Sequence, residues 1–346
     1  DAVLVEFNGE HGNCVATRYL PYPQDLRASL LALHTRGDDD MARGAREANR
    51  LADLYADAVR GLLAQAAVDK ADVRAIACHG QTVRHVPAQG YTIQLNNPAR
   101  LVEGTGITVI ADFRSRDIAA GGQGAPLVPA FHAARFGRAD RHRVVLNIGG
   151  IANLTDLAPG KPVRGFDTGP GNLLLDAWIQ QQKSENFDRD GRWASSGAIR
   201  HDLLERLLAH PYFVEPPPKS CGREQFDIAW LEGQLQGGED PADVQATLAA
   251  LTVASVTEAL HRWCGRPDEL LVCGGGAHNL ALMDGLRAGI PVAQVAPTDT
   301  VGVPADWVEA IAFAWLAKRT LAGLPGNLPE VTGAAGPRVL GAIFPA

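Results

Sequence analysis

Apolar residues in the first third of the chain follow two different periods. Short runs at 2–7 and 13–20, joined through Asn8-Gly9 and Gly12, predict a β-hairpin. Between 45 and 67 apolar side chains return every three or four positions, which predicts a long amphipathic helix. Further short apolar runs, each followed by polar residues, predict strands at 73–78, 91–95 and 107–111.

A similar series of elements follows in the second part of the chain. Strands are predicted at 144–148, 151–157, 162–166 and 270–273. Helices are predicted after Asn172, at 203–208, from Pro241, from Leu280 and around 308–316. A hairpin followed by strands alternating with helices therefore occurs twice. This predicts an α/β protein with two domains that face each other across a cleft.

The polar, charged stretch around 138–143 is the predicted domain boundary. It divides the chain into an N-terminal domain, 1–138, and a C-terminal domain, 139–346, whose last residues are expected to pack back on the first domain. The chain has 346 residues, which is enough for roughly two domains of about 150 residues each. An apolar content of 46% supplies two sizeable cores.

Charge and cysteine content exclude several classes of partner. The net charge is −7 and no basic block is present, so neither a nucleic-acid partner nor a membrane surface is indicated. No apolar run approaches the roughly 18 residues of a membrane span. An odd number of cysteines without paired spacing favours a reducing, cytoplasmic setting and argues against a zinc site. The cysteines are Cys14, Cys78, Cys221, Cys264 and Cys273.

Candidate chemistry centres on the stretch 163–172, V-R-G-F-D-T-G-P-G-N. Asp167 is expected where an apolar strand stops and a helix starts, and ligands bind at such strand ends in α/β sheets. The glycines allow close approach of the backbone to a ligand, and the free N–H groups of a helix start attract anions. The alternative is that Asp167 only caps the helix.

Glycine clusters follow three of the predicted strands, at Gly149-Gly150, at Gly169 and Gly171, and at 274–276. Each cluster could let backbone donors reach phosphate oxygens, although glycines after strands are also ordinary turn residues. Three clusters in one domain, with Asp167 among them, favour nucleotide binding. The phosphate loop G-x-x-x-x-G-K-[ST] and the motifs G-x-S-x-G and H-E-x-x-H are absent from the sequence.

Several segments resemble the anhydro-N-acetylmuramic acid kinase family. They follow one another in a single order from end to end. These segments are H-G-Q-T (79–82), D-F-R-S-R-D-I-A-A-G-G-Q-G-A-P-L-V-P (112–129), L-N-I-G-G-I-A-N (146–153), G-F-D-T-G-P-G-N (165–172), K-S-C-G-R-E-Q-F (219–226), V-C-G-G-G-A-H-N (272–279) and V-T-G-A (331–334). The resemblance implies the actin/hexokinase/Hsp70-type ATPase fold, with two actin-like (ribonuclease H-like) domains facing an interdomain cleft.

The resemblance also implies a reaction. ATP, with Mg²⁺, phosphorylates O6 of the amino sugar 1,6-anhydro-N-acetylmuramic acid while water opens the anhydro bridge. The products are N-acetylmuramic acid 6-phosphate and ADP, in the recycling of peptidoglycan from the bacterial cell wall. The family's catalytic aspartate falls on Asp167. The hypothesis is that Asp167 takes a proton from the attacking water. The family also implies a homodimer.

Other site residues are carried over from the same resemblance. Thr82 and Arg116 match sugar-contacting positions expected just beyond strand ends, and a cationic Arg116 suits the lactyl carboxylate of muramic acid. The alternative for Arg116 is a salt bridge with Asp117 or Asp112. Glu309 is either a sugar contact or a solvated helix charge. The candidates for the ATP side are Asp1, Gly149, Gly150, Gly169, Gly171, Asn172, Gly274, Gly275, Gly276 and Asn279.

Three more polar residues in these motifs are assigned less specifically. His79 is expected to be structural rather than catalytic. Lys219 and Arg223 either cover the cleft or serve a subunit contact. The sequence assigns no metal ligands.

The resemblance has one departure at the N-terminus. Family members begin with a strand and the turn M-S-G-T-S-x-D-G, which cradles ATP phosphates, and the sequence here starts just after that turn, with Asp1 matching its final acidic residue. The absent strand is also the expected partner of 2–7. A protein that lacks this turn is expected to have weak or no kinase activity. Two alternative functions are another sugar kinase of the same fold and a non-catalytic protein that binds ATP or a sugar.

Overall fold

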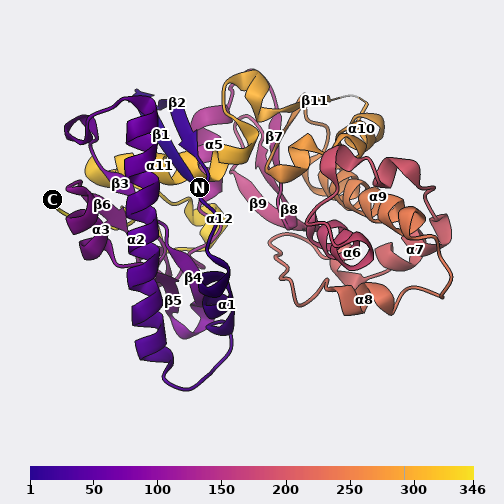
Figure 1. The fold of residues 1–346 in the computed structure, drawn as a ribbon. Coiled ribbons are helices and arrows are strands. Elements are labelled where there is room, and N and C mark those ends of the chain that lie inside the picture. The colour runs from indigo at the N-terminus through magenta and orange to yellow at the C-terminus, as the bar shows by residue number, and fades with distance from the viewer. Residues whose placement is uncertain (292) are drawn as a thin grey trace. The chain divides into compact units, whose positions relative to one another are not determined.

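The computed structural model describes residues 1–291 and 293–346. The chain divides into two compact units, one made of Asp1–Arg135 together with Glu309–Ala346 and the other of Phe136–Val308 (Figure 1). The division after Arg135 lies close to the predicted boundary after 138, and the chain from Glu309 onward belongs to the first unit. Strands and helices occur in both units, so the predicted α/β class is confirmed.

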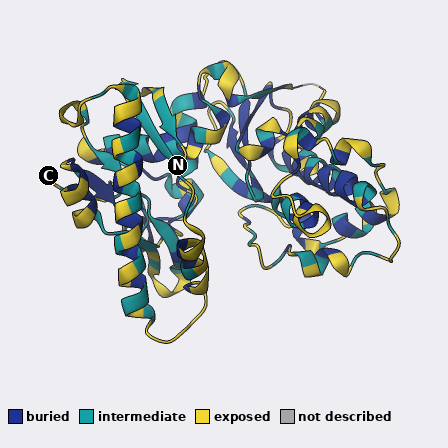
Figure 2. Cartoon of the chain, viewed as in Figure 1, coloured by how far each residue is buried: buried dark blue, intermediate teal, exposed yellow. Residues whose placement is uncertain are grey.

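The first unit opens with the predicted hairpin. β1 (Ala2–Asn8) pairs antiparallel with β2 (His11–Arg18). After α1 (Gln24–Ala32), the long helix α2 (Asp40–Ala66) contacts both strands, and it begins earlier than the predicted position 45. One stripe of α2 is buried while its other side is exposed, as the period of its apolar residues predicts (Figure 2).

Two small sheets complete the strands of the first unit. β3 (Ile76–Ala77) lies parallel to β6 (Val109–Ala111), and β12 (Ala342–Phe344) pairs antiparallel with the other edge of β6. β4 (Gln81–Val86) and β5 (Tyr91–Leu95) form a second hairpin. β3 corresponds to the predicted strand at 73–78 and is shorter than expected. The remaining helices that begin in this unit are α3 (Pro98–Thr105), α4 (Ser115–Ala119), α5 (Val128–Phe136) and α12 (Pro329–Thr332).

The second unit contains a five-stranded mixed sheet. β7 (Arg143–Ile148), β8 (Ile151–Leu157) and β9 (Arg164–Pro170) form an antiparallel meander. β10 (Glu269–Cys273) runs parallel to β7 on one side and to β11 (Gln294–Pro297) on the other. The order across the sheet is β11-β10-β7-β8-β9. The helices are α6 (Leu173–Lys183), α7 (His201–Leu208), α8 (Ile228–Glu232), α9 (Pro241–Ala259), α10 (Leu280–Gly289) and α11 (Val308–Leu321), the last of which continues into the first unit.

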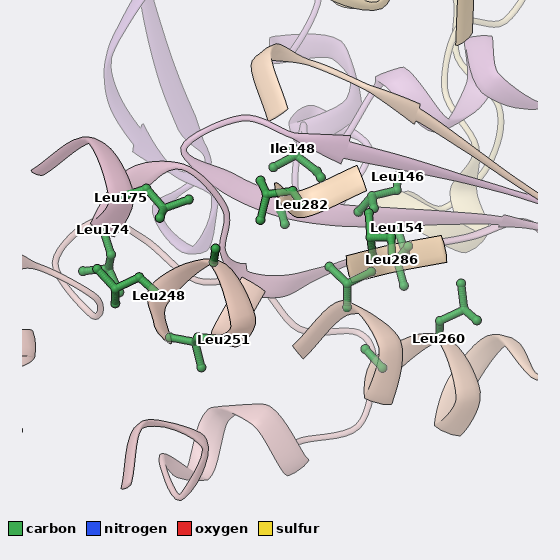
Figure 3. Close-up of a cluster of buried hydrophobic side chains, with 14 of the residues drawn as sticks. Leu146, Ile148, Leu154, Leu174, Leu175, Leu248, Leu251, Leu260, Leu282 and Leu286 are labelled. Atoms are coloured by element: carbon green, nitrogen blue, oxygen red, sulfur yellow. The ribbon is translucent and has the colours of Figure 1, made fainter. Parts of the chain in front are cut away.

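The core of the second unit lies between this sheet and its helices. Alternate residues of β7 and β8, such as Leu146 and Leu154, belong to one buried cluster with residues of α6, α9 and α10. Leu146 and Leu154 lie near Leu286 of α10, and Leu174 of α6 lies beside Leu248 of α9 (Figure 3). Each of these leucines is at most 1% exposed. Burying one such side chain stabilises a fold by about 1.5–3 kcal/mol. The core therefore fixes the sheet, and with it the turns at the sheet's end, as a rigid support.

None of the described helices is both long and apolar enough to cross a membrane.

Candidate active site

The glycine clusters of the second unit meet at one end of its sheet. Gly149 and Gly150 form the turn between β7 and β8, and Gly171 follows the end of β9. The N–H groups of Gly171 and Asn172 donate hydrogen bonds of 2.8 Å to the carbonyls of Gly150 and Gly149, respectively. Gly274 follows β10, whose last residue pairs with Asn147 of β7. Three predicted clusters thus lie together on adjacent strands.

Close packing explains why several of these positions are glycine. A Cβ atom added to Gly171 would lie 2.5 Å from the Gly149 carbonyl oxygen. Gly274, at φ +78°, would place a Cβ 2.5 Å from Oδ1 of Asn147, and Gly276 would place one 2.3 Å from Cγ2 of Ile148. Gly169, at φ +141°, packs against the ring of Phe213, where a Cβ would approach to 2.7 Å. These glycines bring the turns together.

Other glycines of these clusters have backbone N–H groups that are free to bind a ligand. In the described part of the chain, the N–H groups of Gly149 and Gly150 donate no backbone hydrogen bond. The Gly149 carbonyl accepts one backbone hydrogen bond and the Gly150 carbonyl accepts two. Gly275 is exposed, and a Cβ there would lie 3.8 Å from Nδ2 of Asn172, which itself donates to the Ile148 carbonyl at 3.2 Å. Unpaired N–H groups in a turn bind anions. Among the ATP-side candidates, Gly149, Gly150 and Gly275 therefore have the N–H groups best placed to donate to an anion.

Asn279 has a structural role in the fold. Its side chain is 7% exposed, and Oδ1 accepts the Leu282 N–H at 3.2 Å as the N-cap of α10. Its assignment to the ATP side stays a prediction. Asp1, the remaining ATP-side candidate, lies in the first unit directly before β1 and is exposed.

Asp167 lies within β9 and not at its end, because β9 continues to Pro170. The expectation that it sits at the junction of strand and helix is wrong. The capping alternative is also wrong, since α6 begins at Leu173 and its N-cap is Asn172. β9 stays paired because Asn153 faces Asp167 and Ala152 faces Gly169, with an irregularity in register between them. Bulges of this kind redirect side chains next to active sites.

Three neighbours orient Asp167. Its N–H donates to the Lys219 carbonyl at 3.1 Å, and its own carbonyl accepts the Tyr212 hydroxyl at 2.9 Å. Its carboxylate Oδ2 accepts the Cys221 N–H at 3.1 Å. Among the described residues, Oδ1 accepts no hydrogen bond. One oxygen is therefore held in place while the other can take a proton from a substrate.

Burial gives Asp167 the protonation behaviour of a base that works near neutral pH. Desolvation raises its pKa to about 6, although the Cys221 N–H and the charge of Lys219 act in the opposite direction. A general base is most effective when its pKa lies near the working pH, because it is then both ionised and basic enough to accept the proton.

The three sugar-side candidates all lie in the first unit. Thr82 lies in β4 and not beyond a strand end as predicted, and its hydroxyl accepts Nε2 of Gln94 at 3.3 Å. Arg116 is exposed on α4, and Glu309 is exposed in the first turn of α11.

Arg116 forms no ion pair with the described residues, so the alternative of a salt bridge with Asp117 or Asp112 is wrong. Asp117 is 0% exposed and binds Asn327, Thr332 and the Gly124 N–H instead. Asp112 accepts the Ser115 N–H at 3.4 Å. The Arg116 guanidinium is therefore available to an anion.

Arg114 is a cation that the sequence analysis did not single out. Its Nε donates to Nε2 of His79 at 3.0 Å, and its Nη1 donates to the Gly124 carbonyl at 2.7 Å. Burial lowers the pKa of Arg114, while the carboxylate of Glu309 acts against this. Its position in D-F-R-S-R-D, two residues before Arg116, is the one signal in the sequence that could have identified it.

His79 supports this arginine as a neutral side chain. Burial, followed by the charge of Arg114, lowers its pKa to about 4. Its Nδ1 lies 2.8 Å from the Gly80 carbonyl, so Nδ1 carries the proton and Nε2 accepts from Arg114. The ring also packs on Phe313 with centroids 4.6 Å apart.

The residues near the glycine turns fit a nucleotide with its magnesium ion. Among the described residues, no group of three or more histidines, cysteines, aspartates or glutamates could hold a metal. Mg²⁺ bound to a nucleotide takes its ligands mainly from phosphates and water, with one or two carboxylates, so such a group is not required. Asp176 on α6 is half-buried, and burial raises its pKa to about 6; the charge of Arg223 acts against this and that of Asp188 adds to it. A cation nearby would stabilise its ionised form.

These features define a class: an α/β phosphotransferase with glycine turns that suit phosphates and a half-buried carboxylate that suits proton transfer. The family model described as anhydro-N-acetylmuramic acid kinase matches residues 1–346, and the chain belongs to this family.

Curated relatives agree with the family. The chain is 55% identical to the anhydro-N-acetylmuramic acid kinase of Thiobacillus denitrificans (strain ATCC 25259 / T1), over 100% of this chain and 94% of that protein. It is 56% identical to the enzyme of the same name from Pseudomonas paraeruginosa (strain DSM 24068 / PA7), over 100% and 95%. Among solved structures, component A of (R)-2-hydroxyglutaryl-CoA dehydratase from Acidaminococcus fermentans aligns at 16% identity with a TM-score of 0.44, over 77% of this chain and 84% of its own.

Proposed function

We propose that this chain uses ATP and water to convert 1,6-anhydro-N-acetylmuramic acid into N-acetylmuramic acid 6-phosphate and ADP, in the recycling of peptidoglycan. Family membership over residues 1–346 supports the reaction. The single structural observation that carries the mechanism is the carboxylate of Asp167, with one oxygen fixed by the Cys221 N–H and its pKa raised to about 6.

Asp167 acts as the general base. As water attacks the anomeric carbon, one water proton moves to the carboxylate of Asp167. The bond from the anomeric carbon to O6 breaks and its electron pair stays on O6. O6 then forms a bond to the γ-phosphorus, the bond to the β,γ-bridging oxygen breaks, and ADP leaves. A base of this kind is worth about 10²–10⁴-fold in rate.

The glycine turns of the second unit hold the nucleotide in this proposal. The N–H groups of Gly149, Gly150 and Gly275 are the phosphate donors, with Asn172 beside them. Mg²⁺, when bound, neutralises charge on the phosphates during transfer. Gly169, Gly171, Gly274 and Gly276 act indirectly, because the close contacts described above need them to keep the turns together.

The sugar is held by the first unit. Arg116, which forms no ion pair with described residues, is the proposed partner of the lactyl carboxylate, because a guanidinium pairs with a carboxylate through two parallel hydrogen bonds. Thr82 and Glu309 are proposed to contact the sugar hydroxyls. The Thr82 hydroxyl already accepts from Gln94, which leaves its proton for a substrate oxygen.

The setting of the enzyme belongs to the same proposal. All five cysteines are free thiols, which suits a reducing cytoplasm. A homodimer is proposed from the family resemblance. Sedimentation velocity measures it directly, and a monomer at micromolar concentration would contradict it.

The test is incubation of the chain with ATP, Mg²⁺ and the anhydro sugar in ¹⁸O-labelled water. Mass spectrometry should find the label at the anomeric hydroxyl and none in the phosphate. A phosphorylated product that keeps its anhydro ring would instead identify another sugar kinase. ATP binding without ADP release in the presence of sugar would identify a non-catalytic binding protein.

A further inference from the structure

Lys219 is a lysine buried in the second unit. It lies on the connection between the short helix Pro211–Val214 and α8, and it is 9% exposed. Its Nζ donates to the carbonyls of Tyr212 at 2.9 Å and Phe213 at 3.4 Å, and it lies 4.4 Å from the centre of the Tyr212 ring. Lysine is almost never buried unless it is paired. Among the described residues Lys219 makes no salt bridge.

The segment that carries Lys219 also surrounds Asp167. The Lys219 carbonyl accepts the Asp167 N–H, and the Cys221 N–H donates to Oδ2 of Asp167. Tyr212, whose carbonyl binds the Lys219 ammonium, donates its hydroxyl to the carbonyl of Asp167. Lys219 and Tyr212 therefore hold the backbone of Asp167, while the Cys221 N–H holds its carboxylate. The Lys219 ammonium ties this segment to the short helix that carries Tyr212 and Phe213.

A neutral side chain could fill the same space at less cost, because burial of an ammonium loses its hydration. The groups that accept hydrogen bonds from Lys219 are uncharged carbonyls, so none of them neutralises its positive charge. This charge can therefore influence ionisable groups nearby. That charge favours the ionised form of Asp167, against the effect of burial.

We propose that Lys219 is a positioning residue for Asp167, whose buried ammonium keeps the carboxylate ionised near neutral pH and whose contacts hold the segment that orients it. This inference rests on the proposed function, in which Asp167 is the base. It also replaces both sequence-based expectations for Lys219, a cleft cover or a subunit contact, with a buried role.

Other charged and titratable groups around this pair are few. Asp167 faces Lys219 and, on the same segment, Cys221, and it also faces Tyr212. Two other charges act on Lys219. The negative charge of Glu215 favours the protonated form of Lys219, and the positive charge of Arg262 disfavours it. Burial raises the pKa of Cys221 to about 12, so this thiol stays neutral in the range of interest. Lys219 is therefore the cation that acts on Asp167.

The test compares Lys219→Gln with Lys219→Arg. Glutamine can still donate to the Tyr212 and Phe213 carbonyls but carries no charge, whereas arginine keeps the charge. Loss of the cation raises the pKa of Asp167, so the acidic limb of the kcat/KM profile should move to higher pH by roughly one unit in Lys219→Gln. The activity of this variant should therefore fall about tenfold at acidic pH and much less at pH 8.5. Lys219→Arg should keep the limb of the wild type.

Lys161→Gln is the matched control, because Lys161 is exposed in the connection between β8 and β9. Its profile should match the wild type. An equal loss of activity at every pH in Lys219→Gln would overturn the proposal and leave Lys219 a purely structural residue. The same limb in Lys219→Gln and the wild type would overturn it as well.

A second measurement does not depend on the reaction. Carboxyl ¹³C NMR of protein labelled at aspartate, with Asp167→Asn to assign the signal, gives the pKa of Asp167 directly. This pKa should rise in Lys219→Gln, and an unchanged value would overturn the proposal. If the labelled water test finds no ring opening but the pKa rises, the proposed reaction fails while the electrostatic coupling of Lys219 and Asp167 stands.

Discussion

Two aspartates, one in each unit, show how the same side chain has all its hydrogen-bond partners in one place and unused capacity in another. Asp117 of α4 is 0% exposed and accepts three hydrogen bonds: from Asn327 Nδ2 at 2.6 Å, from the Thr332 hydroxyl at 2.7 Å and from the Gly124 N–H at 2.8 Å. Asp167 accepts one bond on its carboxylate from the described residues. A buried carboxylate with all its partners stabilises a fold, whereas one with unmet capacity and a raised pKa marks a candidate site.

The partners of Asp117 explain its role. Asn327 and Thr332 belong to the C-terminal segment, and Gly124 belongs to the loop after α4. The same two segments also meet through the N–H of Gln123, which donates to the Thr332 carbonyl at 2.7 Å. Asp117 thus ties the end of the chain to the loop that follows Arg116. By contrast, the partners of Asp167 surround it and leave one oxygen unused.

The largest effect is expected from Asp167→Asn. Asparagine keeps the size of the side chain and can still accept the Cys221 N–H, but it cannot take a proton from water. Turnover should therefore fall by about 10²–10⁴-fold, while the melting temperature stays close to that of the wild type. Steady-state release of ADP and a thermal melt measure the two quantities. Near-normal turnover would remove Asp167 from the role of base.

Asp117→Ala should have the opposite pattern. It leaves Asn327, Thr332 and the Gly124 N–H without their acceptor, and such a loss costs roughly 3–5 kcal/mol of stability in total. Hydrogen–deuterium exchange should show lost protection in peptides from 117–124 and 327–336, and none in peptides that contain β9. Loss of activity without loss of stability would break the comparison, because Asp117 would then act in chemistry.

The sequence could predict the residue types of the candidate site but not their environment. The glycine turns, Asp167 and Arg116 belong to local motifs with a period and a spacing that can be seen in the chain. The Cys221 N–H that binds the Asp167 carboxylate lies more than 50 residues further along the chain. Two of the three hydrogen bonds to Asp117 come from residues more than 200 positions away. Local patterns carry no information on such partners, so a salt bridge of Asp117 or Asp112 with the nearby Arg116 is the alternative left open.

The ends of two strands differ from the prediction because pairing with a neighbouring strand sets them. The run 162–166 predicts a strand that stops before Asp167, since the glycines and the proline that follow are typical of turns. In the structure, pairing with β8 carries β9 through these residues to Pro170. Similarly, the sequence predicts Gln81 and Thr82 as polar residues after a strand, whereas pairing with β5 makes them the start of β4.

His79 extends the comparison to a buried side chain whose two ring nitrogens both have hydrogen-bond partners and whose protonation depends on pH. Its pKa is lowered in the folded protein from the ordinary 6.5 to about 4. Protonation therefore favours the unfolded chain, and the stability present above pH 6.5 is lost as the pH falls towards 4, by on the order of 3 kcal/mol. Buried His132, with its pKa lowered to about 3, adds a loss in the same direction.

His79→Gln should reduce this loss, because the Gln amide oxygen can still accept from Arg114 and does not become charged. Urea unfolding at pH 7 and pH 4.5 measures the difference for the wild type and the variant. His79→Asn is the matched control, since its shorter side chain reaches the position of Nδ1 and leaves Arg114 without its acceptor. An equal loss in His79→Gln and the wild type would show that His79 does not contribute.

The smallest effect is expected from Asn279→Ala, which tests whether a buried helix cap near the glycine turns also binds ATP. Removal of the N-cap of α10 should cost about 1 kcal/mol of stability. ATP affinity, measured by calorimetry, should stay unchanged if the side chain serves only Leu282, as its single hydrogen bond indicates. Asn279→Asp keeps the cap and is the control for stability. A loss of ATP affinity in Asn279→Ala that exceeds its loss of stability would place Asn279 with Asp167, among residues that act on the ligand.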